Sequence, residues 1–173
     1  IGGINPAYEY ITKAIENRKS VITANKALIS EKGKELFEKA KKEGVYIGFE
    51  GSVGGGIPII KVLKESFIGN KIITIMGILN GTTNYILTKM YYEKINYEKA
   101  LKQAQENGYA EANPSLDIMG IDTAHKLAIL SSLAFNTFID WKKIKTEGIN
   151  NIEIDDIKFA DEFGYRIKLL GVS

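Results

Sequence analysis

The opening of the chain alternates strand-like and helical segments, and this alternation constrains the fold more than any other feature. Residues 20–24 and 45–49 are short runs rich in β-branched and aromatic residues, whereas residues 7–17 and 31–43 are expected to be helical. Residues 1–4 are typical of a strand end that turns into a helix. This order predicts a parallel α/β layer, because parallel strands need a crossover that is usually helical. Three strands rarely close such a layer, so we expect the first half of a dinucleotide-type fold upstream.

The rest of the chain is predicted to be mostly helical. A short turn over residues 26–30, with Asn25 as N-cap, is expected before the second helix. The sequence stops on an apolar strand pattern, so we also expect further chain downstream. Further helices are expected at residues 58–66, 85–92, 97–107, 121–135 and 155–163, and strands at residues 71–79, 141–149 and 165–172.

Composition excludes several classes of function. The chain has 173 residues, of which 45% are hydrophobic and 25% charged, and its net charge is only +2. These values describe a globular protein without the basic surface typical of nucleic-acid binding. No run is long enough to span a membrane and none resembles a signal peptide, so the cytoplasm is the default location. With no Cys and one His, a disulfide framework, a thiol nucleophile and a multi-histidine metal site are all excluded.

Four charged residues gather in residues 108–126. Glu111, Asp117, Asp122 and Lys126 follow one another at spacings of six, five and four residues, across an irregular turn and the start of a helix. Asp122 and Lys126 are one helical turn apart and therefore share a face. The ordinary interpretation of such a pair is an exposed helix ion pair. Three carboxylates and one ammonium are nevertheless well suited to holding a small zwitterion and moving a proton.

Two loops rich in small residues each allow more than one interpretation. Residues 51–58 are glycine-rich and could form a phosphate cradle, a cation site built from carbonyl oxygens, or a tight strand-to-helix turn. The phosphate interpretation is weak, because the loop lacks the Lys-Ser/Thr pair of a P-loop. Residues 80–84, Asn-Gly-Thr-Thr-Asn, are either a ligand-binding loop at a strand end or a well-capped helix start.

Several motifs, in this order, resemble the homoserine dehydrogenase family. They are Thr23-Ala-Asn-Lys26, Glu50-Gly-Ser-Val-Gly-Gly-Gly-Ile-Pro58, Gly77-Ile-Leu-Asn-Gly-Thr-Thr-Asn84, residues 108–126 and the closing Arg166-Ile-Lys-Leu-Leu-Gly171. The resemblance covers essentially the whole chain, but the family's N-terminal NAD(P) fingerprint is not part of it. It implies an α/β chain that begins with the remnant of a parallel Rossmann-type layer, residues 1–49, the C-terminal part of a nucleotide-binding domain. Residues 50–173 would then be an α+β catalytic and dimerisation domain, truncated at its C-terminal end, with a mixed sheet covered by helices.

The resemblance implies interconversion of L-aspartate 4-semialdehyde and L-homoserine with NADPH or NADH, on the route to threonine, methionine and isoleucine. Hydride transfer to an aldehyde produces an alkoxide, so the site needs a proton donor beside the carbonyl oxygen. Lys126 is the candidate donor, and Asp122 would orient it. By resemblance Glu111 contacts the substrate, and Asp117 would add negative charge for its amino group. Lys26 matches the family's other active-site lysine, near cofactor and substrate.

The resemblance also implies a cofactor site, an ion and a partner. Gly2 and Gly3, with Lys26, are expected to border the NAD or NADP cofactor, where a missing side chain allows close approach. We expect a homodimer that acts on a small-molecule substrate, without nucleic-acid or membrane partners. The glycine-rich loop is expected to bind a monovalent cation, usually sodium, mostly through backbone carbonyls, at Glu50, Val53, Gly55 and Ile57.

Other functions stay open at this point. A semialdehyde dehydrogenase that forms a thioacyl enzyme is opposed by the absence of Cys, because that chemistry needs a thiolate. A non-catalytic role is also open, in which the chain is a dimerisation and substrate-binding fragment, inactive without the missing nucleotide-binding half. The sequence does not decide between NADPH and NADH, nor does it reveal fusion to aspartate kinase or a regulatory domain.

Overall fold

The computed structural model describes residues 2–173, which form two compact units. Among these residues, no helix is both long and apolar enough to cross a membrane. The domain limits expected above, residues 1–49 and 50–173, stay a prediction. The first unit contains the chain up to Ile75, His125–Ile144 and Ser173, and the second contains Met76–Ala124 and Lys145–Val172.

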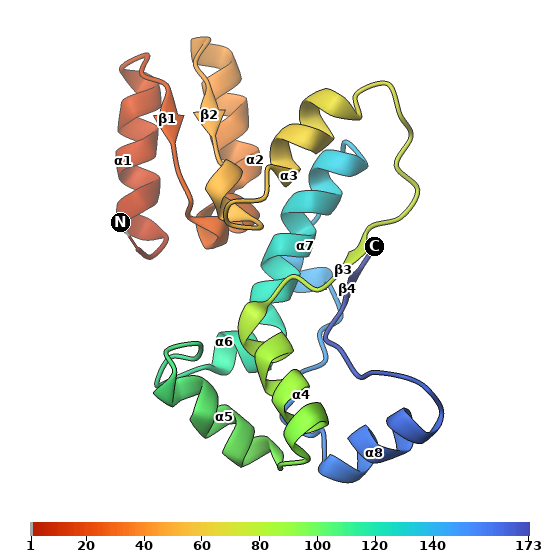
Figure 1. The fold of residues 1–173 in the computed structure, drawn as a ribbon. Coiled ribbons are helices and arrows are strands. Elements are labelled where there is room, and N and C mark those ends of the chain that lie inside the picture. Colours follow the sequence, from red (N-terminus) through yellow and green to blue (C-terminus); the bar gives the residue numbers. More distant parts are fainter. Residues whose placement is uncertain (1) are drawn as a thin grey trace. The chain divides into compact units, whose positions relative to one another are not determined.

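Two helices and two short parallel strands open the first unit (Figure 1). They are α1 (Asn5–Glu16), β1 (Val21–Ile22), α2 (Lys26–Glu43) and β2 (Ile47–Gly48). Val21 pairs with Ile47, and Ile22 pairs with Gly48. The carboxyl ends of both strands therefore lie at the same edge of the pair, which is the edge where α/β proteins bind ligands.

Helix α2 begins earlier than its periodicity predicts. The side chain of Asn25 accepts a hydrogen bond from the backbone N–H of Leu28 at 3.0 Å and so caps the helix. Leu28 and Ile29 are buried, so packing stabilises this first turn as well. The expected turn at residues 26–30 is therefore wrong, whereas the N-cap role of Asn25 is confirmed. The helix ends at Gly44, whose φ of 67° is typical of a glycine that terminates a helix.

An irregular glycine-rich segment follows β2. Its regular parts are the 3-10 helix η1 (Glu50–Ser52), α3 (Ile59–Lys61) and the π-helix η2 (Val62–Ser66). The Glu50 carboxylate caps α3, because it accepts hydrogen bonds from the backbone N–H groups of Ile60 and Lys61, both at 2.9 Å. Most of α7 (Ile121–Ala134) and the 3-10 helix η3 (Trp141–Lys143) also belong to the first unit.

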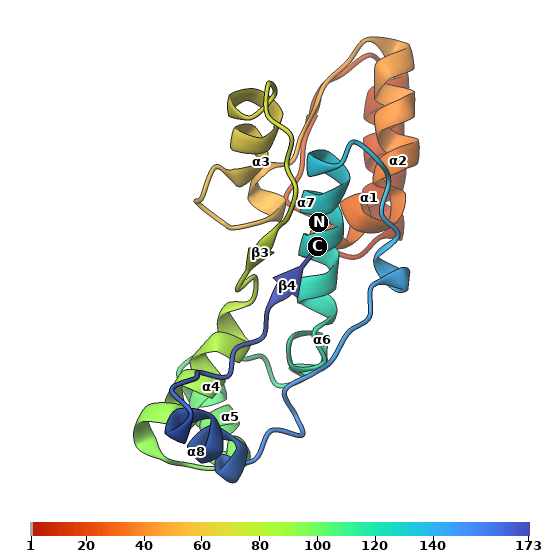
Figure 2. The ribbon, with the colours of Figure 1, turned by 90° about the vertical axis from the view of Figure 1, so that its right-hand side faces the viewer.

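The second unit is built around α4. Its elements are β3 (Met76–Gly77), α4 (Gly81–Glu93), α5 (Tyr97–Glu106), α6 (Ser115–Ile118), the start of α7, α8 (Ile154–Glu162) and β4 (Gly171–Val172). α4 packs against both α5 and α8 (Figure 2). The hydrophobic core of this unit contains Ile86, Leu87, Met90, Ala100, Ala104, Ala110, Ile149 and Ile157.

The predicted fold class is confirmed, since a parallel α/β pair is followed by a helical region with its own small sheet. Met76 pairs with Val172 and Gly77 with Gly171 in antiparallel register, so the expected strands at 71–79 and 165–172 are much shorter than predicted. Residues 141–149 contain a 3-10 turn instead of a strand. The expected strand end at residues 1–4 includes Ile1, which lies outside the described residues, and residues 2–4 form no strand. An apolar run becomes a strand only where a neighbour pairs with it, and sequence pattern does not reveal the neighbour.

Candidate active site

Asn80 is a buried amide that binds two carboxylates in the second unit. It is only 5% exposed, and its Nδ2 donates to Asp117 Oδ1 at 2.8 Å and to Asp122 Oδ2 at 2.9 Å. Its Oδ1 accepts from the backbone N–H of Thr83 at 2.8 Å, as the N-cap of α4. Because a backbone N–H can only donate, this bond fixes the amide orientation and turns Nδ2 toward the acids. Asp117 and Asp122 are thus held together by one neutral donor.

The loop before α6 is attached to the same turn of α4. Thr82 Oγ1 lies 2.7 Å from the carbonyl oxygen of Tyr109 and 3.1 Å from Asp117 Oδ2, so its single hydrogen is shared between these two acceptors. Farther along, Gln105 Nε2 donates to the carbonyl of Glu111 at 3.2 Å. The Glu111 side chain is exposed, so its backbone is anchored while its carboxylate faces solvent.

Helix α7 carries two further candidates, Asp122 and Lys126, four residues apart on one face. Asp122 is buried, and Lys126 is partly buried. Gly120 directly precedes the helix with a φ of 78°, and a Cβ there would lie 3.4 Å from the carbonyl oxygen of Glu147. A glycine at this position lets the chain turn sharply between α6 and α7, which brings the two aspartates to the same amide.

In the first unit, the structure brings Gly3 close to the turn that carries Lys26. Asn25, which follows β1, donates from Nδ2 to the carbonyl of Gly3 at 2.7 Å and caps the helix that starts at Lys26. Gly3 has a φ of 77°, and no atom lies within 4 Å of the place where a Cβ would stand at Gly2 or Gly3. These glycines therefore leave open space beside the lysine at the carboxyl edge of the parallel pair.

The glycine-rich loop has free carbonyl oxygens but an occupied carboxylate. Both carboxylate oxygens of Glu50 are used in capping α3, so this residue would offer a ligand only its backbone oxygen, which already accepts a long hydrogen bond of 3.5 Å from the N–H of Val53. Gly54 and Gly55 have left-handed φ values of 79° and 59°. Within residues 2–173 no donor contacts the carbonyls of Val53 and Gly55, so both remain available to a bound ion.

Two sets of contacts among the predicted residues are described, one within each unit. The Asn80 amide joins Asp117 and Asp122, and Asn25 joins Gly3 to the lysine turn. Glu111 is not joined to either group by any side-chain hydrogen bond within the described residues. Sequence reasoning offers residues 80–84 as a ligand-binding loop but does not name Asn80 or Thr82 among the site residues. The capping interpretation of residues 80–84 is correct, but it accounts for Oδ1 of the asparagine and not for the two hydrogens on Nδ2.

Comparison with known proteins decides between the families considered above. Residues 58–173 match the family model described as Homoserine dehydrogenase, and residues 1–50 match that described as Homoserine dehydrogenase, NAD binding domain. The chain belongs to the homoserine dehydrogenase family. It is 49% identical over 173 residues to a homoserine dehydrogenase of Pseudomonas aeruginosa, and 47% identical over 167 residues to that of Methanocaldococcus jannaschii.

Solved structures of homoserine dehydrogenases have the same fold. The enzyme from Thiobacillus denitrificans superposes with a TM-score of 0.97 at 49% identity, covering 99% of this chain and 40% of that one. A hyperthermophilic archaeal homoserine dehydrogenase in complex with NADPH superposes with a TM-score of 0.81 at 34% identity, covering 88% of this chain and 47% of that one. The chain spans only part of the length of these relatives. The alignment with the Pseudomonas relative covers 100% of this chain and 40% of that protein, and the alignment with the Methanocaldococcus relative covers 96% of this chain and 50% of that protein.

Proposed function

We propose that the protein carrying this chain interconverts L-homoserine and L-aspartate 4-semialdehyde with NAD or NADP. Membership of the homoserine dehydrogenase family supports the reaction type. The observation that carries the proposal is the buried Asn80 amide, which binds Asp117 of α6 and Asp122 of α7, with Lys126 one helical turn after Asp122. The reaction would serve synthesis of threonine, methionine and isoleucine in the cytoplasm, the default location of such pathways.

Lys126 is the proposed proton donor. A nicotinamide cofactor supplies the hydride when bound, and the aldehyde carbon that accepts it leaves an alkoxide oxygen. The Lys126 ammonium would protonate this oxygen, and in the reverse direction the neutral amine would remove the hydroxyl proton of homoserine. Asp122, one turn earlier on the same face of α7, would orient the ammonium. The Asn80 bond keeps the Asp122 carboxylate in one orientation, so the pair would not need to reorganise during the reaction.

The substrate ammonium is proposed to bind to acids of the second unit. Asp117 and Asp122 bind the same amide nitrogen, and we propose that the Asp117 carboxylate also accepts a hydrogen bond from the substrate amino group. Asp117 also faces the Thr82 hydroxyl, which holds it from a second side. Glu111 lies in the anchored loop before α6 with an exposed carboxylate, and we propose that it contacts the bound amino acid.

The cofactor is proposed to lie along Gly2, Gly3 and Lys26. The open space at both glycine Cα atoms fits close approach of a dinucleotide, because a side chain at either position would occupy it. Lys26 begins α2 immediately after the Asn25 cap, so its ammonium projects from a fixed turn. A homoserine dehydrogenase with the same fold has NADPH bound, but nothing in this chain favours NADPH over NADH.

A monovalent cation, sodium being the usual one in the family, is proposed to bind the loop from Glu50 to Ile57. Part of the donor set fits such an ion, because within residues 2–173 no donor contacts the carbonyls of Val53 and Gly55, and the loop contains no Lys or Arg. The carbonyl of Ile57 already accepts a hydrogen bond from the N–H of Ile59 at 2.8 Å. One carboxylate, already used as a helix cap, is too little charge for magnesium or calcium. The ion would have a structural role and would stabilise the conformation of this glycine-rich loop.

The protein is proposed to form a homodimer through the β3–β4 ribbon. Met76 is paired with Val172, and the register places Ile78 opposite Leu170 on the same face. All four side chains are exposed in the chain alone, from 45% for Ile78 to 66% for Met76. An apolar face with open strand edges favours association with a second copy. A monodisperse monomer of the full-length protein at high concentration would contradict this part of the proposal.

The deciding experiment is an assay of the full-length protein with aspartate semialdehyde and, separately, NADPH and NADH. We expect substrate-dependent oxidation of at least one cofactor and formation of homoserine, identified by mass. A protein with Lys126→Ala serves as the blank for contaminating reductases. Absence of homoserine with both cofactors would overturn the proposed activity.

A further inference from the structure

Lys168 is a partly buried ammonium whose partners are neutral. Its Nζ donates to Asn84 Oδ1 and to Thr88 Oγ1, both at 2.8 Å, and no carboxylate of residues 2–173 forms an ion pair with it. Burial lowers its pKa, in keeping with an ammonium that has lost water and gained no counter-ion. Burying a charge in this way is unfavourable, so the residue is a weak choice for simple stability.

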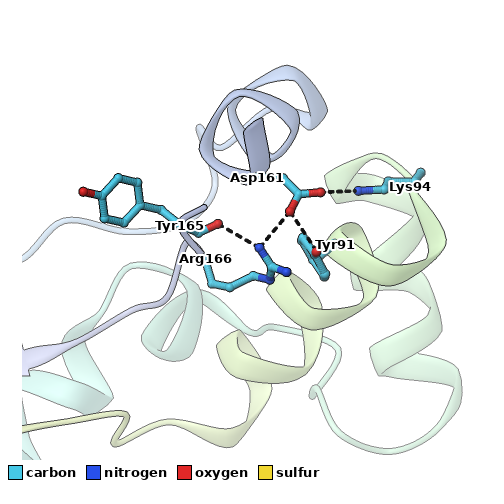
Figure 3. Close-up of polar contacts among 5 residues, drawn as sticks. All are labelled: Tyr91, Lys94, Asp161, Tyr165 and Arg166. Carbon is cyan, nitrogen blue, oxygen red and sulfur yellow. Dashed lines mark hydrogen bonds and ion pairs between the residues drawn. The ribbon is translucent and has the colours of Figure 1, made fainter. Parts of the chain in front are cut away.

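In a neighbouring cluster the cationic side chains are paired with a carboxylate, as is usual. Asp161 of α8 accepts hydrogen bonds from the hydroxyl of Tyr91 at 2.8 Å and from Arg166 at 2.8 Å, and pairs with Lys94 at 3.3 Å (Figure 3). The guanidinium of Arg166 also lies 3.7 Å from the centre of the Tyr91 ring. These contacts hold the C-terminal end of α4 by charge. The other end of the same helix is held by Lys168, two residues after Arg166, through neutral oxygens alone.

The contacts of Lys168 lead directly to the start of α4. Asn84 and Thr88 are four residues apart, so the ammonium spans one turn of the helix on one face. The backbone N–H of Asn84 donates to the carbonyl of Asn80 at 3.4 Å, which is the long first hydrogen bond of the helix. The turn that begins at Asn80 is therefore held by a weak backbone bond, by its own cap, by the Thr82 hydroxyl and by the contact of Lys168 with Asn84.

We propose that Lys168 is a positioning residue, which acts through Asn84 to fix Asn80 and hence the two carboxylates that Asn80 binds. Asn80 directs Asp117 and Asp122 from the first turn of α4, and a small rotation of that turn would change both hydrogen bonds at once. The proposal rests on the proposed function, because the two carboxylates are placed there at the substrate and beside the proton donor. It gives a role to the closing Arg166-Ile-Lys-Leu-Leu-Gly171 motif.

The test compares Lys168→Met with Lys94→Met in the full-length enzyme, below the unfolding temperature of each variant. Both changes remove an ammonium that holds α4, but only Lys168 holds the end that carries Asn80. We expect Lys168→Met to lower kcat/KM for aspartate semialdehyde by about ten- to a hundred-fold, the range expected when reacting groups are misplaced by about an ångström. The KM for the cofactor should stay unchanged, and Lys94→Met should change kcat/KM less than about twofold.

A double-mutant cycle shows whether Lys168 acts through Asn84. Asn84→Ala should reproduce most of the loss in kcat/KM. Adding it to Lys168→Met should lower kcat/KM little further, because both changes remove the same contact between Lys168 and Asn84. Lys168→Gln, which keeps a shorter neutral donor, should recover part of the activity and provides a second variant if Lys168→Met does not fold. Equal kinetics for Lys168→Met and Lys94→Met, or fully additive losses in the cycle, would overturn the inference. A wild-type enzyme that forms no homoserine would instead overturn the proposed function, and this inference with it.

Discussion

Replacing Asn80 with Asp is the sharpest test of the amide that joins the two aspartates. The change keeps the size of the side chain and leaves an oxygen to cap the N–H of Thr83, so it alters only the group that faces Asp117 and Asp122. Two hydrogen bonds to ionised acceptors are lost, each worth about 1.5–3 kcal/mol. Asn80 and Asp122 are buried but Asp117 is partly exposed, so we expect a loss near the lower end of about 3–6 kcal/mol.

The stability of this variant should depend on pH in a specific direction. Two neighbouring carboxylates raise the pKa of the introduced carboxyl in the folded protein above its unfolded value of about 3.9. The folded state then binds the proton more tightly than the unfolded state. The free energy of unfolding therefore falls as pH rises from about 4 through the raised pKa, and recovers in acid, where the protonated carboxyl can again donate one hydrogen.

The assay is urea unfolding at a series of pH values, with the wild type measured at each pH as reference. Asn84→Asp is a matched control on the same helix, because its new carboxylate would face the Lys168 ammonium at the present 2.8 Å contact. Its pKa should be lowered, so its stability relative to wild type should be flat above about pH 4. The reasoning would be refuted if Asn80→Asp were as stable as the wild type at neutral pH, or if the stability of the two variants depended on pH in the same way.

Three further predictions concern the proposed reaction. Lys126→Ala should lower turnover by about two to four decades with a smaller effect on cofactor binding, and near-normal turnover in rapid kinetics would reassign the proton donor, with Lys26 next. Glu111→Gln should raise the KM for aspartate semialdehyde but not for an analogue without the amino group, and equal effects on both would contradict a role at the ammonium. Sodium should stabilise the protein against heat more than an equal ionic strength of a bulky organic cation, and a crystal structure with sulfate bound to the N–H groups of residues 51–56 would rule out the cation site.

The sequence predicts helices well here and strands poorly. Helical periodicity is a local property, and the expected helices at residues 97–107, 121–135 and 155–163 lie within a residue or so of α5, α7 and α8. The N-cap of α2 is predicted at Asn25, but the first turn of the helix is assigned to a separate turn because the periodicity of residues 26–30 is weak. Strand length depends on a partner, and only Met76–Gly77 meets Gly171–Val172, about a hundred residues later in the chain.

The candidate site could be predicted as a list of residues but not as a set of contacts. Spacing places Asp122 and Lys126 on one face of a helix, because the helix itself fixes that relation. Spacing cannot reveal that Asn80 reaches across 37 and 42 residues to two acids, since this depends on how α4, α6 and α7 pack. Asparagine has two polar ends, and a capping motif explains only the one that accepts a hydrogen bond.

The amide at Asn80 is also a potential site of slow deamidation. It is followed by Gly81, and an asparagine before glycine is the dipeptide most open to attack by the next backbone nitrogen on its side-chain carbonyl. That attack expels ammonia and closes a cyclic imide, which water then opens to aspartate or isoaspartate. In the aspartate product a carboxylate stands in place of the amide and would face Asp117 and Asp122 with a negative charge. In the folded chain the amide is held at both ends, so the attack needs a local opening of the first turn of α4. Samples stored partly unfolded should therefore age at Asn80 as well as at the exposed Asn107, which precedes Gly108. Molecules aged at Asn80 should be less stable at neutral pH and should recover stability in acid.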